Sequence, residues 1–224
     1  MINDIRSFKD YFFTGEWHIH TKYTDGKNSV EEYCSVAEEL GIPLLAFTEH
    51  VRKNMTYDFS KLLEDIKKAQ GKYPNLILLS GCETKVLSNG ELDAEDALLD
   101  KVDYKLFAFH SFPPDKELFI NALIRALSNT KVHTWAHPGL FFLKNKNLNL
   151  TSNELRYIFE FAYKNKKYIE YNLKYKLPNS SWLNMMSKQM ACDQIIIGGD
   201  IHSIEQMCNS KLEKEKIVPA IFAK

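Results

Sequence analysis

The chain has 224 residues, of which 45% are hydrophobic and 26% charged, and its 29 basic residues equal its 29 acidic residues. This composition is typical of a globular protein with a sizeable core, and zero net charge gives no reason to expect non-specific binding to nucleic acid or to an anionic membrane. No stretch approaches the roughly 18 uninterrupted apolar residues of a membrane span, and the first residues do not resemble a signal peptide.

The predicted elements alternate between strand and helix. A strand over 11–17 precedes a helix over 30–40, for which Ser29 and Glu32 form a capping box and Gly41 is the stop signal. Further strands are predicted at 43–48, 76–79, 104–109, 132–135, 168–171 and 195–197. Further helices are predicted at 60–72, 94–99, 114–127, 152–164 (capped by Ser152) and 180–190, with a hairpin over 84–90 and short helical pieces at 203–208 and 216–222.

About seven βα units follow one another without a linker or a repeat, so we expect a single domain over residues 1–224. Parallel strands joined by helical crossovers form either a barrel or a doubly wound sheet. In both folds the reactive groups lie at the carboxyl ends of the strands.

The cysteines give no sign of a disulfide framework. Cys34, Cys82, Cys192 and Cys208 are far apart and form no CxxC pair. This spacing favours reduced, mostly buried thiols over disulfides or a cysteine-rich metal site. We therefore expect a cytoplasmic protein.

Six of the seven histidines lie at the ends of hydrophobic, strand-like runs: His18, His20, His50, His110, His137 and His202. The seventh, His133, falls inside a predicted strand and is interpreted as structural or exposed. A single histidine of this kind is more often a hydrogen-bonded core ring than a ligand. Six at equivalent positions are not independent accidents, and imidazoles gathered with carboxylates are what a multi-metal site needs.

The first motifs place donors near the start of the chain. In His18-Ile19-His20, the strand alternation points both rings to one face, so both can reach one cation. Asp25-Gly26 is equally compatible with a simple turn and with a carboxylate ligand. In Thr48-Glu49-His50 the last two side chains point to opposite faces, and we predict that His50 faces the site.

The later motifs supply the remaining donors. Glu83 follows a buried strand and can bridge two cations. In His137-Pro138-Gly139, proline and glycine break the chain directly after the ring and fix it at a strand exit. In Gly198-Gly199-Asp200-Ile201-His202, the carboxylate and the ring share a face, and the glycines permit close approach of the backbone.

Taken in order, these motifs resemble those of the PHP (polymerase and histidinol phosphatase) superfamily over residues 17–203. Glu170-Tyr171-Asn172 also looks like a strand end of that family. The resemblance implies an α/β fold, a distorted (β/α)7 TIM-like barrel, with a three-metal cleft. By the same resemblance a first cation is held by His18, His20, Glu83 and Asp200, a second by Glu83, His110 and His137, and a third by Asp25, His50 and His202.

The resemblance also implies the chemistry. Some relatives have a histidine near position 25, so Asp25 departs from their pattern. The cations would be zinc, manganese or iron, since mixed imidazole and carboxylate ligands do not choose among them. Glu83, Asp200 and His202 are the candidate catalytic residues. Arg52, directly after the His50 motif, is the candidate contact for a substrate phosphate.

Charge favours phosphate chemistry. The positive charge of three divalent cations exceeds the negative charge of the three carboxylates, and a phosphate-ester dianion with one hydroxide would balance the excess. Water polarised by the cations would attack the phosphorus atom in line. The leading prediction is a metal-dependent phosphatase acting on a small phosphomonoester such as histidinol phosphate. The alternative is a phosphodiesterase or 3′–5′ exonuclease acting on nucleotides or DNA, which the neutral net charge disfavours. A scaffold without metals is disfavoured by the complete ligand set.

Overall fold

The computed structural model describes residues 5–189 and 194–222. Seven parallel strands form one sheet in which each strand lies beside the next in sequence. The strands are β1 Glu16–Ile19, β2 Leu44–Val51, β3 Ile77–Lys85, β4 Tyr104–Ala108, β5 Thr134–Trp135, β6 Tyr168–Asn172 and β7 Ile195–Gly198.

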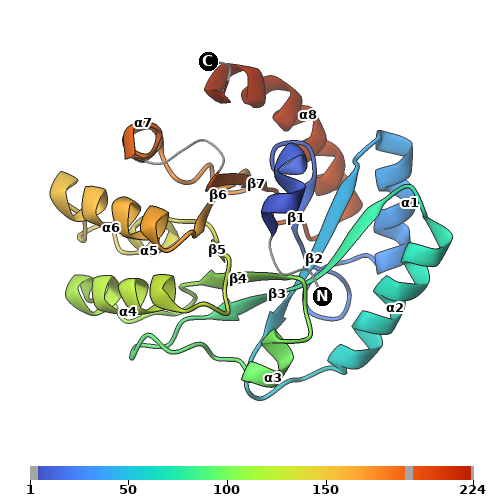
Figure 1. Ribbon diagram of the computed structural model, residues 1–224, viewed down its shortest axis with the longest axis horizontal. Helices are drawn as coiled ribbons and strands as arrows, with labels where there is room; N and C mark the ends of the chain where they lie inside the picture. The colour runs from blue at the N-terminus through green and yellow to red at the C-terminus, as the bar shows by residue number, and fades with distance from the viewer. Residues whose placement is uncertain (1–4, 190–193, 223–224) are drawn as a thin grey trace.

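The helices surround the strands (Figure 1). A 3₁₀ helix, η1 Ile5–Tyr11, precedes α1 Val30–Leu40, α2 Phe59–Lys72, α3 Asp96–Leu99, α4 Lys116–Ser128, α5 Leu140–Lys144, α6 Ser152–Lys164, α7 Ser180–Gln189 and α8 Ile204–Phe222. Among the described residues, no helix is both long and apolar enough to cross a lipid bilayer.

The two ends of the sheet meet, so that the strands form a nearly closed barrel. Just after β7, the Ile201 N–H donates to the His18 carbonyl, and the Ile201 carbonyl accepts from the His20 N–H, both at 2.8 Å. This pairing joins the first and last motifs of the chain, which are separated by about 180 residues of sequence. The predicted TIM-like (β/α)7 barrel is confirmed.

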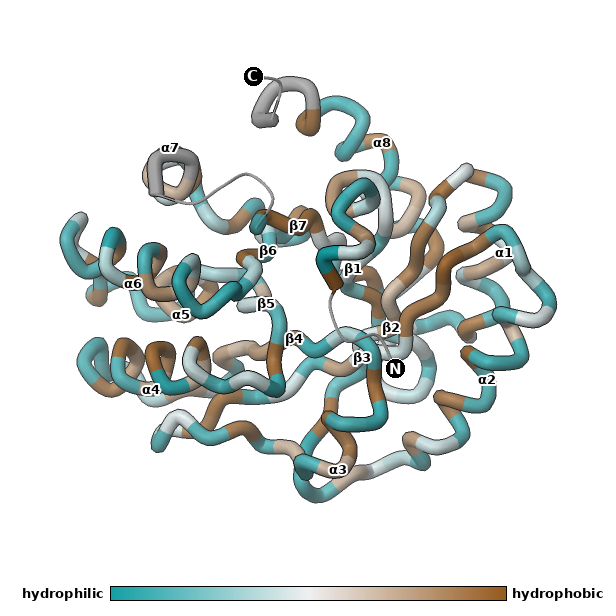
Figure 2. Tube along the Cα trace, viewed as in Figure 1, coloured by the Kyte–Doolittle hydropathy of each residue, from teal (hydrophilic) through white to brown (hydrophobic). Residues whose placement is uncertain are grey.

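Apolar side chains pack on both sides of the strands. In β2, Leu44 and Ala46 belong to the inner cluster of the barrel, whereas Leu45 and Phe47 pack outward against the helices. This alternation follows from the two-residue period of a strand. Hydrophobic residues accordingly concentrate on the strands and on the inner faces of the helices (Figure 2).

The local predictions were confirmed in most helices. Ser29 caps α1 with Glu32 in a capping box, and Gly41 ends the helix with φ 63°. The predicted turn near residue 90 exists, with an antiparallel bridge between Val86 and Leu92. Cys34, Cys82 and Cys208 are free, whereas Cys192 and the last residue of the predicted helix 180–190 lie outside the described residues.

Several predictions about the elements were wrong, and the strand predicted to end at residue 79 runs to Lys85. Residue 11 ends η1, and the first strand is Glu16–Ile19, because aromatic residues before it fill the inner cluster of the barrel instead of pairing in the sheet. Thr151, not Ser152, caps α6, with its side chain accepting from the Glu154 N–H. The two final helical pieces form one helix, α8, and the short helix α5 was not predicted.

Candidate metal centre

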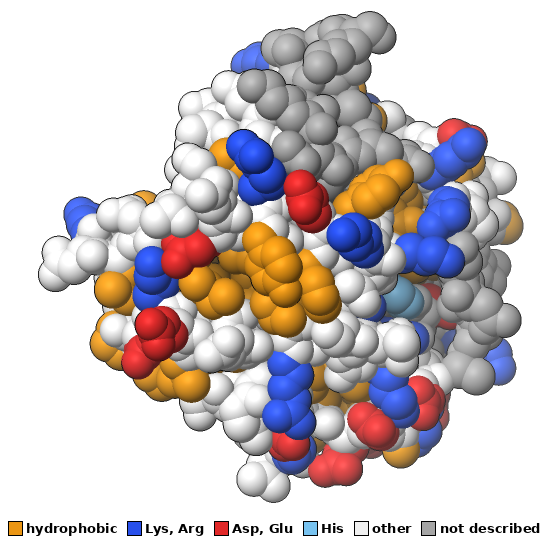
Figure 3. Space-filling model, turned by 60° about the vertical axis from the view of Figure 1, so that its left-hand side comes forward, with side chains coloured by type: hydrophobic (Ala, Val, Ile, Leu, Met, Phe, Trp, Pro, Cys, Tyr) orange, Lys and Arg blue, Asp and Glu red, His pale blue; other side chains and the backbone are white. Residues whose placement is uncertain are grey.

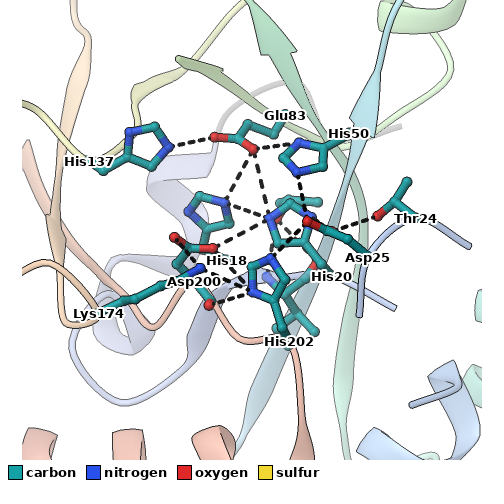
Figure 4. Close-up of polar contacts among 12 residues, drawn as sticks. His18, His20, Thr24, Asp25, His50, Glu83, His137, Lys174, Asp200 and His202 are labelled. Atoms are coloured by element: carbon teal, nitrogen blue, oxygen red, sulfur yellow. Dashed lines mark hydrogen bonds and ion pairs between the residues drawn. The ribbon is translucent and has the colours of Figure 1, made fainter. Parts of the chain in front are cut away.

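The nine predicted ligands lie in one cluster at the carboxyl ends of the strands, and Figure 4 shows how most of them face one another. The start of the barrel supplies His18 from β1 and His20 directly after that strand, and its end supplies Asp200 and His202 after β7. His50 and Glu83 come from neighbouring strands, with their Cα atoms in register. Barrel closure therefore gathers donors from the whole chain.

Glu83 is the centre of the cluster. Its carboxylate is 1% exposed. Its oxygens lie 2.8 Å from His50 Nδ1, 3.1 Å from His110 Nε2 and 2.8 Å from His137 Nε2. They also lie 3.8 Å from the Nε2 atoms of His18 and His20. One carboxylate thus faces five imidazoles.

Asp25 forms the outer part of the cluster. Its oxygens lie 3.5 Å from His50 Nε2 and 3.3 Å from His202 Nε2, and 3.9 Å from His20 Nδ1. Its side chain is 54% exposed, whereas the His20 ring is fully buried. The cluster therefore opens to solvent on the side of Asp25.

Asp200 and His202 complete the arrangement. Asp200 lies 3.7 Å from His20 Nε2 and 3.4 Å from His202 Nδ1. His202 Nδ1 also lies 2.9 Å from the Asp200 carbonyl oxygen. When Nδ1 donates its proton to that carbonyl, the lone pair of the ring is on Nε2, which faces Asp25 and can bind a cation.

The backbone is strained at this rim. His137 has φ 33° and Asp200 has φ 50°, both in the left-handed region that ordinary residues rarely adopt, and Ser111, directly after His110, has φ 49°. Each such residue costs on the order of 1–3 kcal/mol and persists where the surroundings fix it, often at functional sites. Of the described non-glycine residues with positive φ, three belong to or adjoin the cluster.

The ring nitrogens fit divalent cations. His20 Nδ1, His50 Nδ1 and His110 Nε2 are buried and form no hydrogen bond with any described group, although the last two lie close to Glu83. His18 Nε2 and His20 Nε2 face each other at 3.0 Å. Buried lone pairs that converge without donors are unfavourable, and coordination to a cation would satisfy them.

The pKa values shift in different directions within the cluster. Burial lowers the pKa of His18, but Glu170 and Glu83 outweigh it and raise that pKa well above its usual value. Burial alone would raise the pKa of Glu83, but the facing His110 and His18 rings lower it well below its usual value. Burial, helped by His18 and His50, lowers the pKa of His20 well below its usual value. Burial is outweighed at His50, where Asp25 and Glu83 raise the pKa to about 9. At neutral pH, Glu83 is thus an anion and His20 a neutral ligand, and His50 carries a proton that a cation must displace.

Glu170, on β6, holds the ring of His18 and the backbone of His137. One oxygen lies 2.7 Å from His18 Nδ1, and the other accepts from the His137 backbone N–H and, at 3.1 Å, from the Asn172 amide. A carboxylate at Nδ1 holds the ring so that Nε2 faces the cations. The sequence noted the Glu170-Tyr171-Asn172 segment only through the resemblance, because a residue two positions inside a strand gives no ligand signal of its own.

Other candidates have different surroundings. Glu49 points away from His50, as predicted for neighbouring strand residues. Arg52 donates from Nη1 to the Val51 carbonyl at 2.6 Å, and its Nε lies 3.9 Å from Asp93. His133 accepts from the Lys105 N–H at 3.2 Å and stacks on Tyr104.

Lys174 contacts two members of the cluster directly. Its Nζ is 3.2 Å from Asp200 and 3.5 Å from His202 Nδ1. Lys174 has no motif of its own in the sequence, because only the turn after β6 aims its side chain at the cluster.

Comparison with known proteins identifies the family of the chain. A model of the PHP domain family matches residues 16–204. The chain is 24% identical over 205 residues to the "DNA polymerase/3'-5' exonuclease PolX" of Bacillus subtilis (strain 168), covering 88% of this chain and 35% of that protein. The chain therefore spans about a third of the length of this curated relative.

Two solved structures share the fold. The histidinol phosphate phosphatase of Lactococcus lactis, solved with zinc, L-histidinol and phosphate, has a TM-score of 0.60 and 12% identity, covering 90% of this chain and 93% of that chain. A two-domain Bacteroides vulgatus protein containing a predicted PHP-like metal-dependent phosphoesterase has a TM-score of 0.50 and 15% identity, covering 86% of this chain and 52% of that chain.

Proposed function

The chain belongs to the PHP domain family of metal-dependent phosphoesterases, and we propose that it hydrolyses a small phosphomonoester at a centre of three divalent cations. The observation that carries the proposal is the single buried carboxylate of Glu83 among five imidazoles, several of whose nitrogens have no hydrogen-bond donor. The proposed unit is one domain over residues 1–224.

The donor groups divide into three overlapping sets. His18, His20 and Glu83 form one, and His50, Glu83 and His110 a second, with His137 on the same carboxylate. His20, Asp25, His50 and His202 form the outer set. Glu83 shared between sets is what a bridging ligand requires. In this proposal the cations are zinc, manganese or iron.

When bound, the cations would polarise the phosphate oxygens and lower the pKa of water, which supplies the nucleophile. The protein residues fix where this happens. The rings of His18 and His20 are fully buried, whereas those of His50, His110 and His202 are 26%, 24% and 17% exposed. The ester therefore enters from the side of the three exposed rings and Asp25.

Lys174 is the proposed contact for the substrate phosphate. Its Nζ lies 3.2 Å from Asp200 and its side chain is 33% exposed, so it can turn from that carboxylate to an incoming anion. Lys and Arg side chains lie close to the exposed histidine surface (Figure 3), and hydrophobic side chains gather beside it. Such surroundings suit a phosphate joined to a small organic group. Arg52 stays a candidate of lower rank because it is held by Val51 and Asp93.

The experiment is a substrate screen with the metal-reconstituted protein. The protein is stripped with a chelator, reloaded with zinc, manganese or iron, and assayed on p-nitrophenyl phosphate, bis-p-nitrophenyl phosphate and a panel of phosphorylated metabolites including histidinol phosphate. We expect monoester hydrolysis that is lost on chelation and restored by metal. No hydrolysis in any metal-loaded sample would contradict the proposal.

The second candidate function is a phosphodiesterase or 3′–5′ exonuclease. It is favoured by the similarity to PolX, whose name includes a 3′–5′ exonuclease activity. It is disfavoured by the zero net charge of the chain, since binding of a nucleic-acid backbone depends on phosphate neutralisation by Lys and Arg. Faster hydrolysis of the diester, or shortening of single-stranded DNA from its 3′ end, would select this function over the first.

A further inference from the structure

Asp25 lies on a loop, unlike the other predicted ligands that lie on or next to strands. The loop folds back on itself through a hydrogen bond of 3.0 Å from the Gly26 N–H to the Thr21 carbonyl. A Cβ atom at Gly26 would lie 2.1 Å from the His20 carbonyl oxygen, so only glycine permits this close packing. Because Asp25 is also the most exposed of the nine side chains, its position depends on whatever fixes the loop.

A buried carboxylate lies beneath that loop. Glu49, on β2, has no exposed surface and faces away from His50. One oxygen accepts from the Thr21 backbone N–H at 2.6 Å, and the other accepts from the Thr24 hydroxyl. No ion pair within 4 Å joins Glu49 to a described Lys or Arg, so the loop donors are what compensate the loss of its hydration.

By donating its single proton to Glu49, the Thr24 hydroxyl fixes the residue directly before Asp25 in the loop. Its oxygen lies 3.2 Å from Asp25 Oδ1, and Figure 4 shows it beside that side chain. At its other end the loop is fixed by the Lys27 N–H, which donates to the His202 carbonyl at 2.7 Å. The loop is therefore tied to β2, which carries His50, and to the segment after β7 that carries His202, both members of the outer set.

We propose that Glu49 and Thr24 are positioning residues that hold Asp25 against His50 and His202 for the outermost cation. The inference rests on the proposed function and adds a division of labour to it. Glu170 contacts His18 and the backbone of His137 and so supports the inner cations, whereas Glu49 contacts only the loop of the outer one. The two buried glutamates thus orient different cations of one centre.

The test measures zinc affinity cation by cation in the full chain. Wild-type protein and the variants Thr24→Val, Thr24→Ser, Glu49→Gln and Glu170→Gln are loaded with Zn²⁺ and dialysed against increasing chelator, and bound zinc is counted by elemental analysis. In Thr24→Val and Glu49→Gln, we expect one zinc per chain to be released at a free-zinc level on the order of 10–100-fold higher than in wild type. Thr24→Ser keeps the hydroxyl and should match wild type, and Glu170→Gln should loosen the other cations.

Thermal unfolding of the metal-free variants is the structural control. The proposal is overturned if Thr24→Val holds all its zinc like wild type, or if Thr24→Ser and Thr24→Val are weakened alike. It is also overturned if every zinc is loosened together with a large fall in metal-free unfolding temperature. Wild-type protein that takes up no zinc would instead contradict the proposed function itself, which keeps the two failures distinguishable.

Discussion

The Nδ1 atom of His18 lies 2.7 Å from a carboxylate oxygen of Glu170, so that β1 and β6 are linked across the inside of the barrel. The same carboxylate accepts the backbone N–H of His137. The contact fixes which nitrogen of His18 faces the centre, because Nδ1 is occupied and Nε2 is left to point toward Glu83 and His20.

Glu170→Gln should therefore weaken metal binding without removing a ligand. The amide removes the negative charge behind His18, and we expect zinc affinity to fall on the order of 10–100-fold. Zinc retention against a chelator measures the effect. Unchanged zinc affinity would show that the contact does not orient the ring.

Gly198→Ala tests the same contact from the opposite side. A Cβ atom at Gly198 would lie 1.9 Å from Glu170 Oε1, so the carboxylate must move away from His18. Because Glu170 is buried and hydrogen-bonded, and the same Cβ atom would lie 3.1 Å from His18 Cβ, we expect a fall in unfolding temperature together with a loss of zinc affinity similar to that of Glu170→Gln. Gly71→Ala is the control, since a Cβ atom there meets no atom within 4 Å.

Glu83→Gln should reduce turnover far more than it disturbs folding. The variant removes the bridging charge, and we expect kcat/KM to fall by at least about 10³-fold, in the range seen when electrostatic stabilisation of a transition state is removed. The metal-free variant should stay folded but unfold at a lower temperature than wild type, because the amide no longer balances the protonated ring of His50. Glu91→Gln, at an exposed position, should leave both measurements unchanged. A Glu83→Gln protein that keeps its activity would refute the bridging role.

Lys174→Met should raise KM for a phosphomonoester. The variant removes the cation that lies 3.2 Å from Asp200 and faces the open side of the cluster, and we expect kcat/KM to fall about 10–100-fold with the zinc content unchanged. Lys176→Met is the matched control, because Lys176 is 74% exposed and lies near Glu213 instead. Equal effects of the two substitutions would argue against a specific contact.

Lys167 should make stability depend on pH. Burial lowers the pKa of Lys167 to about 8, and its Nζ has only the Asn129 and Val132 carbonyls as hydrogen-bond partners among the described groups. Between pH 8 and about 10.5 the unfolded chain binds more protons at this lysine than the folded protein does, so folding stability rises with pH in that window. Wild type should gain about 2–3 kcal/mol of unfolding free energy relative to Lys167→Met between pH 8 and 10.5. The free energy of unfolding is measured by denaturant titration at each pH. If it changes with pH equally in wild type and Lys167→Met, the expectation is contradicted.

The local elements of this protein could be read from its sequence because their signals are short-range. Ser29 and Glu32 lie within one turn of the helix that they cap, and the alternation of strands and helices needs only the period of the apolar residues. The first strand was misplaced for the opposite reason. Phe12 is apolar enough for a strand, but it packs into the inner cluster beside Trp17 and Tyr168, a contact that its own neighbours do not encode.

The sequence by itself determined which donors the protein has, since their residue types and their positions after strand-like runs mark them one by one. Only the tertiary structure decided how they are held. Glu170 reaches His18 across 152 residues of sequence, and Glu49 reaches the loop of Asp25 from the hidden face of β2. Such contacts depend on barrel closure and strand register, which set distances in space between residues far apart in the chain and therefore leave no local pattern.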